Sequence, residues 1–572
     1  MKKLLLLLVC LMSLTAVSCS GDYDIPEDSM LDGTFYGVGD GRNGQIVVAL
    51  TVSGHEITDI KIVSHAELPF AIPALEQIVA EVLSKQTTEG VDAVSGASLT
   101  SAGLLQALTN AINASRGIYS DEEDYSDCSC DIVVVGAGGA GLSAAIEAHS
   151  LGKNVIVLEK MGIVGGNTNY STGGINAAGT EEQAELGIED SPELHFNDTM
   201  AGGHYYNDPD LVHTFTGLAA AAVKWLKSLG ADLSDVGKMA GSSVPRSHRP
   251  KGGSAIGSHL VKVLKDNTLN DGIPIRLRNE VTSLLTDVNG TVTGVEVSTA
   301  KGSYKITAKA VIIATGGFGS NAALIGKFCP ELKDFPTSNH PGATGDALEW
   351  IEAVQADTTQ MAFIQTHPTG DKYSHILITE AVRGNGAILV NREGVRFANE
   401  MITRDSLSAA ILAQEGKSAF IVFGESVRKS LAVIETYISQ GLVKQSGSLD
   451  GLASITGLPS AALVPAVEKY NHSQESGVDG EFGRLAADMP RPIDPPYYAI
   501  EVEPLIHHTM GGIKIDTKAR VLHKDGSPVK GLYAAGEVTG GVHGDNRLGG
   551  NAVADIIIFG RIAADTASEE MR

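Results

Sequence analysis

The sequence has few cysteines, few aromatic residues and no excess of positive charge. Its 572 residues include 5 Cys, 5% aromatics, and 43 Lys and Arg against 68 Asp and Glu, which gives a formal net charge of −25. Binding to nucleic acid or to an anionic membrane surface requires basic patches, so this balance argues against both. The low aromatic content also argues against stacking on bases.

The N-terminus carries an export signal. A basic start, residues 1–3, is followed by an apolar run, residues 4–17, that is too short to span a bilayer. The small residues before Cys19 resemble a bacterial lipobox. We therefore expect a lipoprotein signal peptide over residues 1–18, lipidation of Cys19, and an acidic tether over residues 19–30. An ordinary cleaved signal peptide is the alternative. With lipidation, the protein would be periplasmic and attached to the membrane through Cys19.

Glycine, by contrast, is abundant at 66 residues. A first unit, residues 31–115, contains alternating strand patterns and then helical spacing. The polar and acidic residues 116–130 show no pattern, which is typical of a linker. The thiols left after processing, Cys128, Cys130 and Cys329, form no disulfide framework. In the first unit the expected strands are 45–52 and 57–63, and the expected helices are 72–85 and 101–114.

A complete βαβ unit follows the linker. A buried strand over 131–135 runs into a glycine-rich turn, GAGGAG (136–141), and then into a helix over 142–150. A second strand, 154–158, ends just before Glu159. The glycines allow a tight turn and a close approach of the backbone to a pyrophosphate, which the helix N-terminus faces. Because Glu159 stands where a carboxylate binds ribose hydroxyls, the unit predicts dinucleotide binding.

Further glycine turns favour FAD over NAD. A nicotinamide site rarely needs three distant glycine turns, whereas an extended and permanently held FAD does. The alternative is that these segments are only tight turns. They are GGNT (165–168) with STGG (171–174), ATGG (314–317) and GLYAAGE (531–537).

Five ordered motifs mark the C-terminal three-quarters of the chain: QTHPT (365–369), ITEAVRGNG (378–386), NEMITRD (399–405), HHTMGG (507–512) and HGDNRLGGN (543–551). With them, residues 131–572 resemble the flavoprotein subunit of fumarate reductases and succinate dehydrogenases, above all the soluble periplasmic flavocytochrome c type. The resemblance implies an FAD-binding domain in two parts, 131–361 and 506–572, with a capping (clamp) domain, 362–505, inserted between them.

The resemblance also assigns residues to the FAD site. His508 is the least certain in role, because it could support the neighbouring loop instead. The assigned residues are Gly136, Gly138, Gly139, Ala140, Gly141, Glu159, Lys160, Gly166, Asn167, Thr168, Gly173, Gly174, Thr315, Gly316, Gly317, Asp346, His508, Gly536, Glu537, Leu548 and Asn551.

The implied substrate is a small dicarboxylate with an activated double bond, fumarate, which is reduced to succinate. Its two anionic ends need two sets of donors. His507 and Arg547 match the positions that hold one carboxylate, and His367 and Thr379 match those that hold the other. After hydride transfer from flavin N5, a proton is required. The matching proton donor and its relay are Arg404, Glu380 and Arg383; an arginine acid works only if the relay reprotonates it at once.

Taken singly, these residues have structural interpretations too. His367, which precedes a proline, could form a turn. Arg404 and Asp405 could form a surface ion pair. His507 and His508 could be a pair of metal ligands or a pair of core residues. Their family order favours function, and we expect no metal site.

Two departures from the family concern cofactors. Asn167 occupies the position of the histidine to which membrane-bound members attach FAD, and an amide cannot form that bond, so we expect non-covalent FAD. No Cys-x-x-Cys-His occurs in the sequence, so we expect no c-type haem.

Residues 31–115 resemble instead the FMN-binding domain of sodium-pumping quinone reductase. The motif is DAVSGASLTS (92–101), in which the family attaches FMN through its phosphate to the hydroxyl after Gly-Ala, here Ser98. Serine replaces the usual threonine and offers the same oxygen. A Ser/Thr-rich turn before a helix is the alternative. Attachment would require a separate flavin transferase.

The sequence thus predicts an α/β protein: a Rossmann-like FAD-binding domain, an inserted α+β capping domain and a small N-terminal α+β FMN-binding domain. Electrons would pass from a membrane quinol-linked donor through FMN and FAD to fumarate. A sibling reductase of urocanate, acrylate or a cinnamate is the first alternative, although His367 and Thr379 favour a second carboxylate. An oxidase running in reverse, such as L-aspartate oxidase, and a flavin electron carrier without a substrate are the others.

Overall fold

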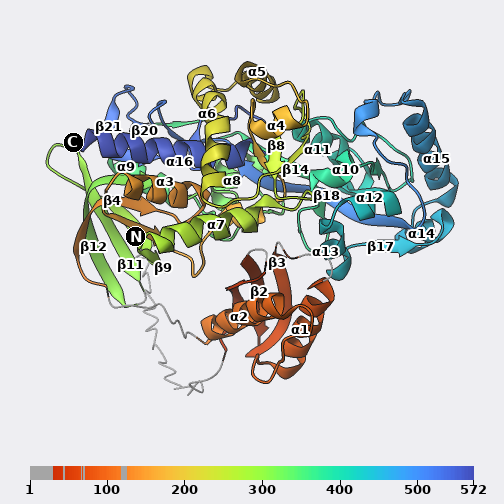
Figure 1. Ribbon diagram of the computed structural model, residues 1–572, viewed down its shortest axis with the longest axis horizontal. Helices are drawn as coiled ribbons and strands as arrows, with labels where there is room; N and C mark the ends of the chain where they lie inside the picture. Colours follow the sequence, from red (N-terminus) through yellow and green to blue (C-terminus); the bar gives the residue numbers. More distant parts are fainter. Residues whose placement is uncertain are drawn as a thin grey trace, which may run out of the picture.

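The computed structural model describes residues 30–42, 45–65, 67, 71–116, 125–299 and 301–571. The predicted signal peptide, Cys19 and the tether up to residue 29 lie outside the described residues. Within those ranges, none of the helices combines the length and the apolar character that crossing a membrane requires. A small N-terminal unit lies against one side of a larger body, whose FAD-binding and capping parts lie side by side (Figure 1).

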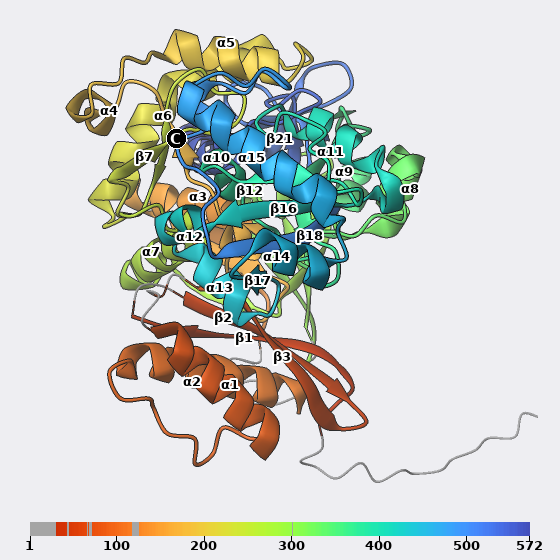
Figure 2. The same ribbon diagram turned by 90° about the vertical axis from the view of Figure 1, so that its right-hand side faces the viewer.

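The N-terminal unit is an antiparallel sheet in the order β1-β2-β3, covered on one face by two helices. Helix α2 approaches β1 closely because glycines face it: a Cβ at Gly37 or Gly39 would lie 1.9 Å from a carbonyl oxygen of α2. The other face of the sheet is turned toward the main body (Figure 2). The elements are β1 (Gly33–Asp40), β2 (Gln45–Ser53), β3 (Glu56–Ser64), α1 (Ile72–Lys85) and α2 (Ser98–Ser115).

Helix α2 and strand β4 (Cys128–Val135) begin earlier than the sequence predicts. Helix α2 begins at Ser98 rather than at residue 101, and the buried Thr100 hydroxyl in its first turn donates a hydrogen bond to Glu67. Strand β4 begins inside the predicted linker, because residues 128–130 pair with β12 (Gly302–Ile313).

The main body is built on an eight-stranded sheet with a parallel centre, β21-β12-β4-β5-β9. Its strands are buried Val and Ile runs, as parallel strands covered on both faces must be. Together with the other two parts, this sheet confirms the predicted α/β fold class. The remaining elements of this part that carry the argument are β5 (Val155–Glu159), β9 (Ile275–Leu277), β10 (Glu280–Thr286), β11 (Val292–Thr299), β20 (Arg520–Leu522), β21 (Pro528–Ala534), α3 (Gly139–Ser150), α7 (Ile256–Asn270), α16 (Asn551–Glu570) and the 3-10 helix η2 (Gly166–Tyr170).

The capping part has its own sheet, ordered β14-β18-β16-β15, and its own core. Strand β18 runs unbroken past residue 505, the predicted end of the clamp, so the strand itself carries His507 and His508 back toward the FAD-binding part. The elements are β14 (Ile364–Asp371), β15 (Ile388–Val390), β16 (Ala419–Gly424), β17 (Lys444–Ser446), β18 (Tyr497–Thr509), α10 (Glu380–Gly384), α11 (Arg404–Leu412), α12 (Glu425–Ser430), α13 (Val433–Ser439), α14 (Leu449–Thr456) and α15 (Ser460–Ser476).

Shorter elements connect these sheets. They are β6 (Ile175–Asn176), β7 (Asp235–Gly237), β8 (Ser247–Arg249), β13 (Thr358–Thr359), β19 (Gly512–Lys514), β22 (Thr539–Gly540), α4 (Glu181–Glu185), α5 (Pro192–Gly202), α6 (Pro209–Ser228), α8 (Ala322–Phe328) and α9 (Ala347–Ala353).

A buried ion network fixes the short helix α10. The Arg484 guanidinium donates to the carbonyl oxygens of Arg383, in the last turn of that helix, and of Ala387, three residues after it, and pairs with Glu400 at 2.9 Å. Glu400 also binds Arg396 at 2.7 Å. Because all these charges are buried and paired, the end of α10 is held firmly in place.

Candidate active site

An elongated cavity follows the βαβ unit. The turn between β4 and α3 is tight: Gly136 has φ +106°, and a Cβ at Gly141 would lie 1.8 Å from the Gly136 carbonyl oxygen. Both positions therefore require glycine. The predicted FAD-binding residues that line this cavity are Gly136, Gly138, Gly139, Ala140, Glu159, Lys160, Gly166, Asn167, Thr168, Thr315, Gly316, Asp346 and Glu537.

The lining fits an extended dinucleotide. The first turn of α3 lines the cavity, and the positive end of a helix suits a pyrophosphate, although Gly139 N already donates to Thr168 Oγ1 at 3.0 Å. The half-buried Glu159 carboxylate accepts from Ala137 N at 2.9 Å and Met161 N at 2.8 Å, and desolvation raises its pKa. Among the described residues, Thr315 Oγ1 and His340 Nε2 are buried without a hydrogen-bond partner. A bound cofactor would satisfy such atoms.

Several predicted FAD residues lie behind the cavity wall rather than on it. Gly317 packs against Thr509, where a Cβ would lie 2.1 Å from Oγ1. Asn551, fully buried at the start of α16, bonds Asn176 at 2.8 Å and Thr199 at 3.1 Å. The contacts of Gly317 and Asn551 thus position the backbone behind the cavity wall. The predicted residues outside both cavity linings described here are Gly141, Gly174, Gly317, Gly536, Leu548 and Asn551.

Sequence reasoning missed part of the FAD cavity. Residues Asn279–Val281 reach it because β10 follows β9 at the edge of the parallel sheet, and no glycine motif marks them. His340 and Trp350 also come from segments without a dinucleotide signature. The other missed lining residues are Met161, Ile163, Gly342 and Ala343.

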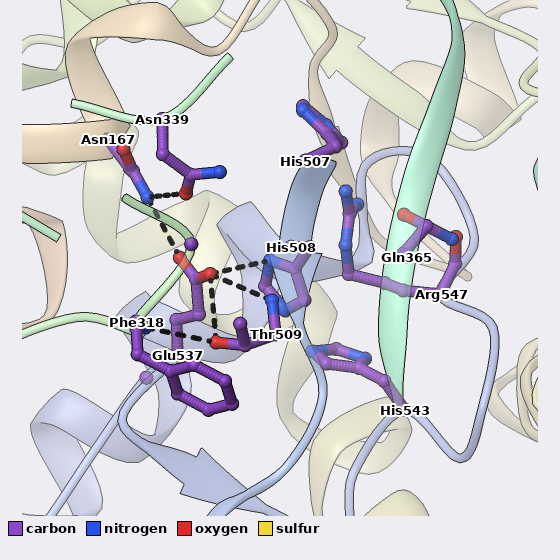
Figure 3. Close-up of polar contacts among 12 residues, drawn as sticks. Asn167, Phe318, Asn339, Gln365, His507, His508, Thr509, Glu537, His543 and Arg547 are labelled. Atoms are coloured by element: carbon purple, nitrogen blue, oxygen red, sulfur yellow. Dashed lines mark hydrogen bonds and ion pairs between the residues drawn. The ribbon is translucent and has the colours of Figure 1, made fainter. Parts of the chain in front are cut away.

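A second cavity meets the first at Asn167, Thr168, Glu537 and Ile556, which line both. At this junction Asn167 Nδ2 donates to Asn339 Oδ1 at 2.6 Å and to Glu537 Oε2 at 3.1 Å. Glu537 also accepts from Thr509 N at 3.0 Å (Figure 3). The Asn167 amide is thus fixed by internal hydrogen bonds.

The second cavity gathers the predicted ligand residues. His367 comes from β14, Thr379 from the N-cap of α10, His507 from β18, and Arg547 from the loop before α16. The rings of His367 and His507 are 5.2 Å apart, edge to face. His507 Nδ1 lies 2.8 Å from Ser338 Oγ, which no motif identified. His508 and Gly173, predicted for FAD, line this cavity too.

Arg404 enters the same cavity beside its predicted relay. Its Nε donates to Glu380 Oε2 at 3.2 Å and its Nη1 to Gln365 Oε1 at 3.2 Å. Arg383 Nη2 lies 3.9 Å from the same Glu380 oxygen, behind the cavity wall. The structure therefore places the predicted acid and relay residues in contact one after another, from Arg404 to Glu380 to Arg383. Gln365, which steadies Arg404, was not predicted.

Arg547 lacks an ion-pair partner in this cavity: among the described residues no carboxylate lies within 4 Å of it and its Nε is buried without a hydrogen bond, whereas Arg404 pairs with Glu380. Burial lowers the pKa of Arg547 to about 9 and that of Arg383 to about 10. Burial and nearby Arg404 hold the pKa of His367 and of His507 well below the ordinary value, so both rings are neutral near pH 7. Clustered cations destabilise each other, and a bound anion would relieve this.

Ser98 lies apart from both cavities. It is exposed at the first turn of α2, after Gly96 with φ +88°. Nearby hydroxyls are engaged: Ser101 Oγ, for example, accepts from Val94 N at 3.1 Å.

Comparisons with known proteins match two stretches of the chain. A family model described as an FAD binding domain matches residues 131–553, and one described as an FMN-binding domain matches residues 41–113. "Fumarate reductase (cytochrome)" of Shewanella frigidimarina is 50% identical over 77% of this chain and 77% of its own length. "NADH:fumarate oxidoreductase" of Klebsiella pneumoniae is 41% identical over 92% of this chain, which covers 57% of that protein. A solved flavocytochrome c3 fumarate reductase in an open conformation superposes with a TM-score of 0.66 and 43% identity, over 77% of this chain and 78% of that one.

Proposed function

The chain belongs to the FAD-dependent fumarate reductase family of oxidoreductases, and we propose that it reduces fumarate to succinate with electrons passed from FMN to FAD. The observation that carries the proposal is the second cavity, where the buried Arg547 has no carboxylate within 4 Å among the described residues, its Nε lacks a hydrogen bond, and Arg404 repels it. A dianion supplies the missing charge. His507 and Arg547 would hold one carboxylate, and His367 and Thr379 the other.

The proposed protonation uses the line of charged groups behind the substrate. Bound FAD, once reduced, supplies a hydride to one alkene carbon. Arg404 gives a proton to the neighbouring carbon, which completes succinate. Burial would raise the pKa of Glu380, but Arg404 and Arg383 outweigh it and hold this pKa below its ordinary value. The Glu380 carboxylate is therefore ionised and able to pass a proton from Arg383 to Arg404.

The test is the oxidation of reduced methyl viologen by the flavinylated protein. Fumarate, urocanate, acrylate and cinnamate are offered in parallel. We expect rapid turnover with fumarate, because the cavity presents donors for two carboxylates. Turnover only with a monocarboxylate would contradict the fumarate assignment.

Replacing Arg547 with Lys should weaken fumarate binding and change its pH dependence. A cation whose pKa is about 9 is protonated below that pH, so kcat/KM for fumarate should fall as pH rises through 9. Lys has a lower ordinary pKa than Arg, and burial lowers it further, so R547K should move this fall to lower pH. Lysine cannot form the two parallel hydrogen bonds that a guanidinium makes to a carboxylate, so kcat/KM at pH 7 should fall roughly 10- to 100-fold.

The pH profile of kcat/KM measures this effect, with R520K as the control. Arg520 pairs with Asp516 on the surface, away from both cavities. An unchanged profile in R547K would show that Arg547 does not hold the substrate.

We further propose export as a lipoprotein, with Cys19 anchoring the enzyme to the membrane beside a quinol-linked electron donor. FAD would be held without a covalent bond, and a flavin transferase would attach FMN. Cys19→Ala should shift the protein from the membrane fraction to the soluble fraction, measured by fractionation and immunoblotting. Unchanged partition would contradict the anchor.

A further inference from the structure

A cavity of about 400 Å³ separates the N-terminal sheet from the main body, and we propose that it receives the isoalloxazine ring of the FMN attached at Ser98. The inference rests on the proposed covalent FMN. One wall is the sheet face turned away from α1 and α2, with Tyr36 and Ala49. The other walls are α13, with Gln440, and residues 169–172 of the FAD-binding part.

The size of this cavity separates it from the substrate site. The substrate cavity measures about 140 Å³ and the FAD cavity about 100 Å³. The interdomain cavity is larger than both and lies at the boundary between parts that are expected to carry different flavins. Its position between the two parts, together with this room, suits the ring of a second flavin.

The interdomain cavity and the substrate cavity share a wall. A ring in the interdomain cavity would be separated from the FAD and substrate sites by a single layer of side chains, which is the short separation that electron transfer between two flavins needs. The residues that line both cavities are Tyr170, Ser171, Thr172, Ser338, Asn339 and Leu377.

The lining offers contacts that a flavin ring can use. The Tyr36 and Tyr170 rings lie 5.7 Å and 5.6 Å from the ring of His340, which itself lines the FAD cavity. Aromatic rings in such clusters stack well on a planar ligand. Asn169 Oδ1 is buried in a residue only 3% exposed, and within the described ranges neither it nor Gln440 Oε1 has a hydrogen-bond partner. The N–H of the flavin's pyrimidine edge is a donor for such an acceptor.

The residues beside Ser98 contact the segment between β3 and α1, which also reaches the cavity. Ala97, before it, packs against Ala71 at the start of α1, and Thr100 bonds Glu67. The chain before Glu67 brings His65 into the cavity, where its Nε2 lies 3.0 Å from Thr436 Oγ1 of α13. A flavin tethered through its phosphate at Ser98 would therefore extend past this segment into the cavity.

The test fills the cavity in the full-length flavinylated holoenzyme from two sides, with Ala49→Trp and Gln440→Trp as separate variants. Asp59→Trp is the matched control, because Asp59 is exposed and pairs with Thr51 on the same sheet but lies outside the cavity lining. In-gel fluorescence first establishes that covalent FMN is retained. FMN emission and the stopped-flow rate of electron transfer from FMN to FAD are then measured.

We expect brighter FMN emission and electron transfer slowed roughly tenfold or more in both cavity variants, because a displaced ring loses its short path to FAD. Emission and rate within about twofold of the Asp59→Trp control would overturn the inference. That result would leave the proposed function standing, provided that FAD reduced directly by dithionite still reduces fumarate. Absence of covalent FMN from the unmodified protein, in contrast, would contradict the proposed function itself.

Discussion

Arg404→Ala should lower kcat for fumarate roughly 10²- to 10⁴-fold, the usual contribution of a positioned general acid. The side chain lies in the substrate cavity, and its Nε and Nη1 groups are held by Glu380 and Gln365. Alanine removes both the proton and the charge that Arg404 brings into the cavity beside Glu380. FAD absorbance should be unchanged, because Arg404 does not line the FAD cavity.

The control is Arg392→Ala, an exposed arginine of the capping part that pairs with Glu501. Stopped-flow experiments separate the chemical step from electron supply. In Arg404→Ala, FAD should still be reduced at the normal rate but should no longer be reoxidised by fumarate. Activity within tenfold of the unmodified enzyme would contradict the assigned acid. It would show that a group other than Arg404 supplies the proton.

The βαβ unit was predictable because its parts are contiguous in the chain. Strand, glycine turn, helix and Glu159 follow one another within one segment, and the structure places them at one end of the FAD cavity. The ligand residues could be predicted only through the family resemblance. His367 and Arg547 are far apart in the sequence, and nothing in their spacing places them in one cavity.

Other features depend on packing that no local pattern records. The salt bridge between Arg484 and Glu400 joins segments that are 84 residues apart in the capping part, and its effect on α10 appears only when both are folded. The interdomain cavity arises because two separately folded units meet, so neither sequence segment signals it. Ser338, which holds His507, likewise lies in a segment without a motif.

Ser98→Ala should abolish covalent FMN completely and with it reduction of fumarate by the physiological donor. Formation of the phosphoester needs a hydroxyl oxygen, and alanine has none. Neighbouring hydroxyls cannot take over easily: Thr100 and Ser101 are buried and hydrogen-bonded, whereas Ser98 is exposed to an attaching enzyme. In-gel fluorescence of the denatured protein, coproduced with a flavin transferase, measures the loss.

Two variants sharpen this result. Ser98→Thr keeps a hydroxyl at the attachment point, in the form that is usual in the FMN-binding family, and should keep the fluorescence. Ser95→Ala removes a different exposed hydroxyl of the same loop and should also keep the fluorescence. Single-turnover oxidation of dithionite-reduced FAD by fumarate should be unaffected in Ser98→Ala, because both cavities that serve this step lie in residues beyond the N-terminal unit. Fluorescence that survives Ser98→Ala but disappears in Ser95→Ala would move the attachment point within the loop. Fluorescence that persists in both variants would show that FMN is not attached to this loop.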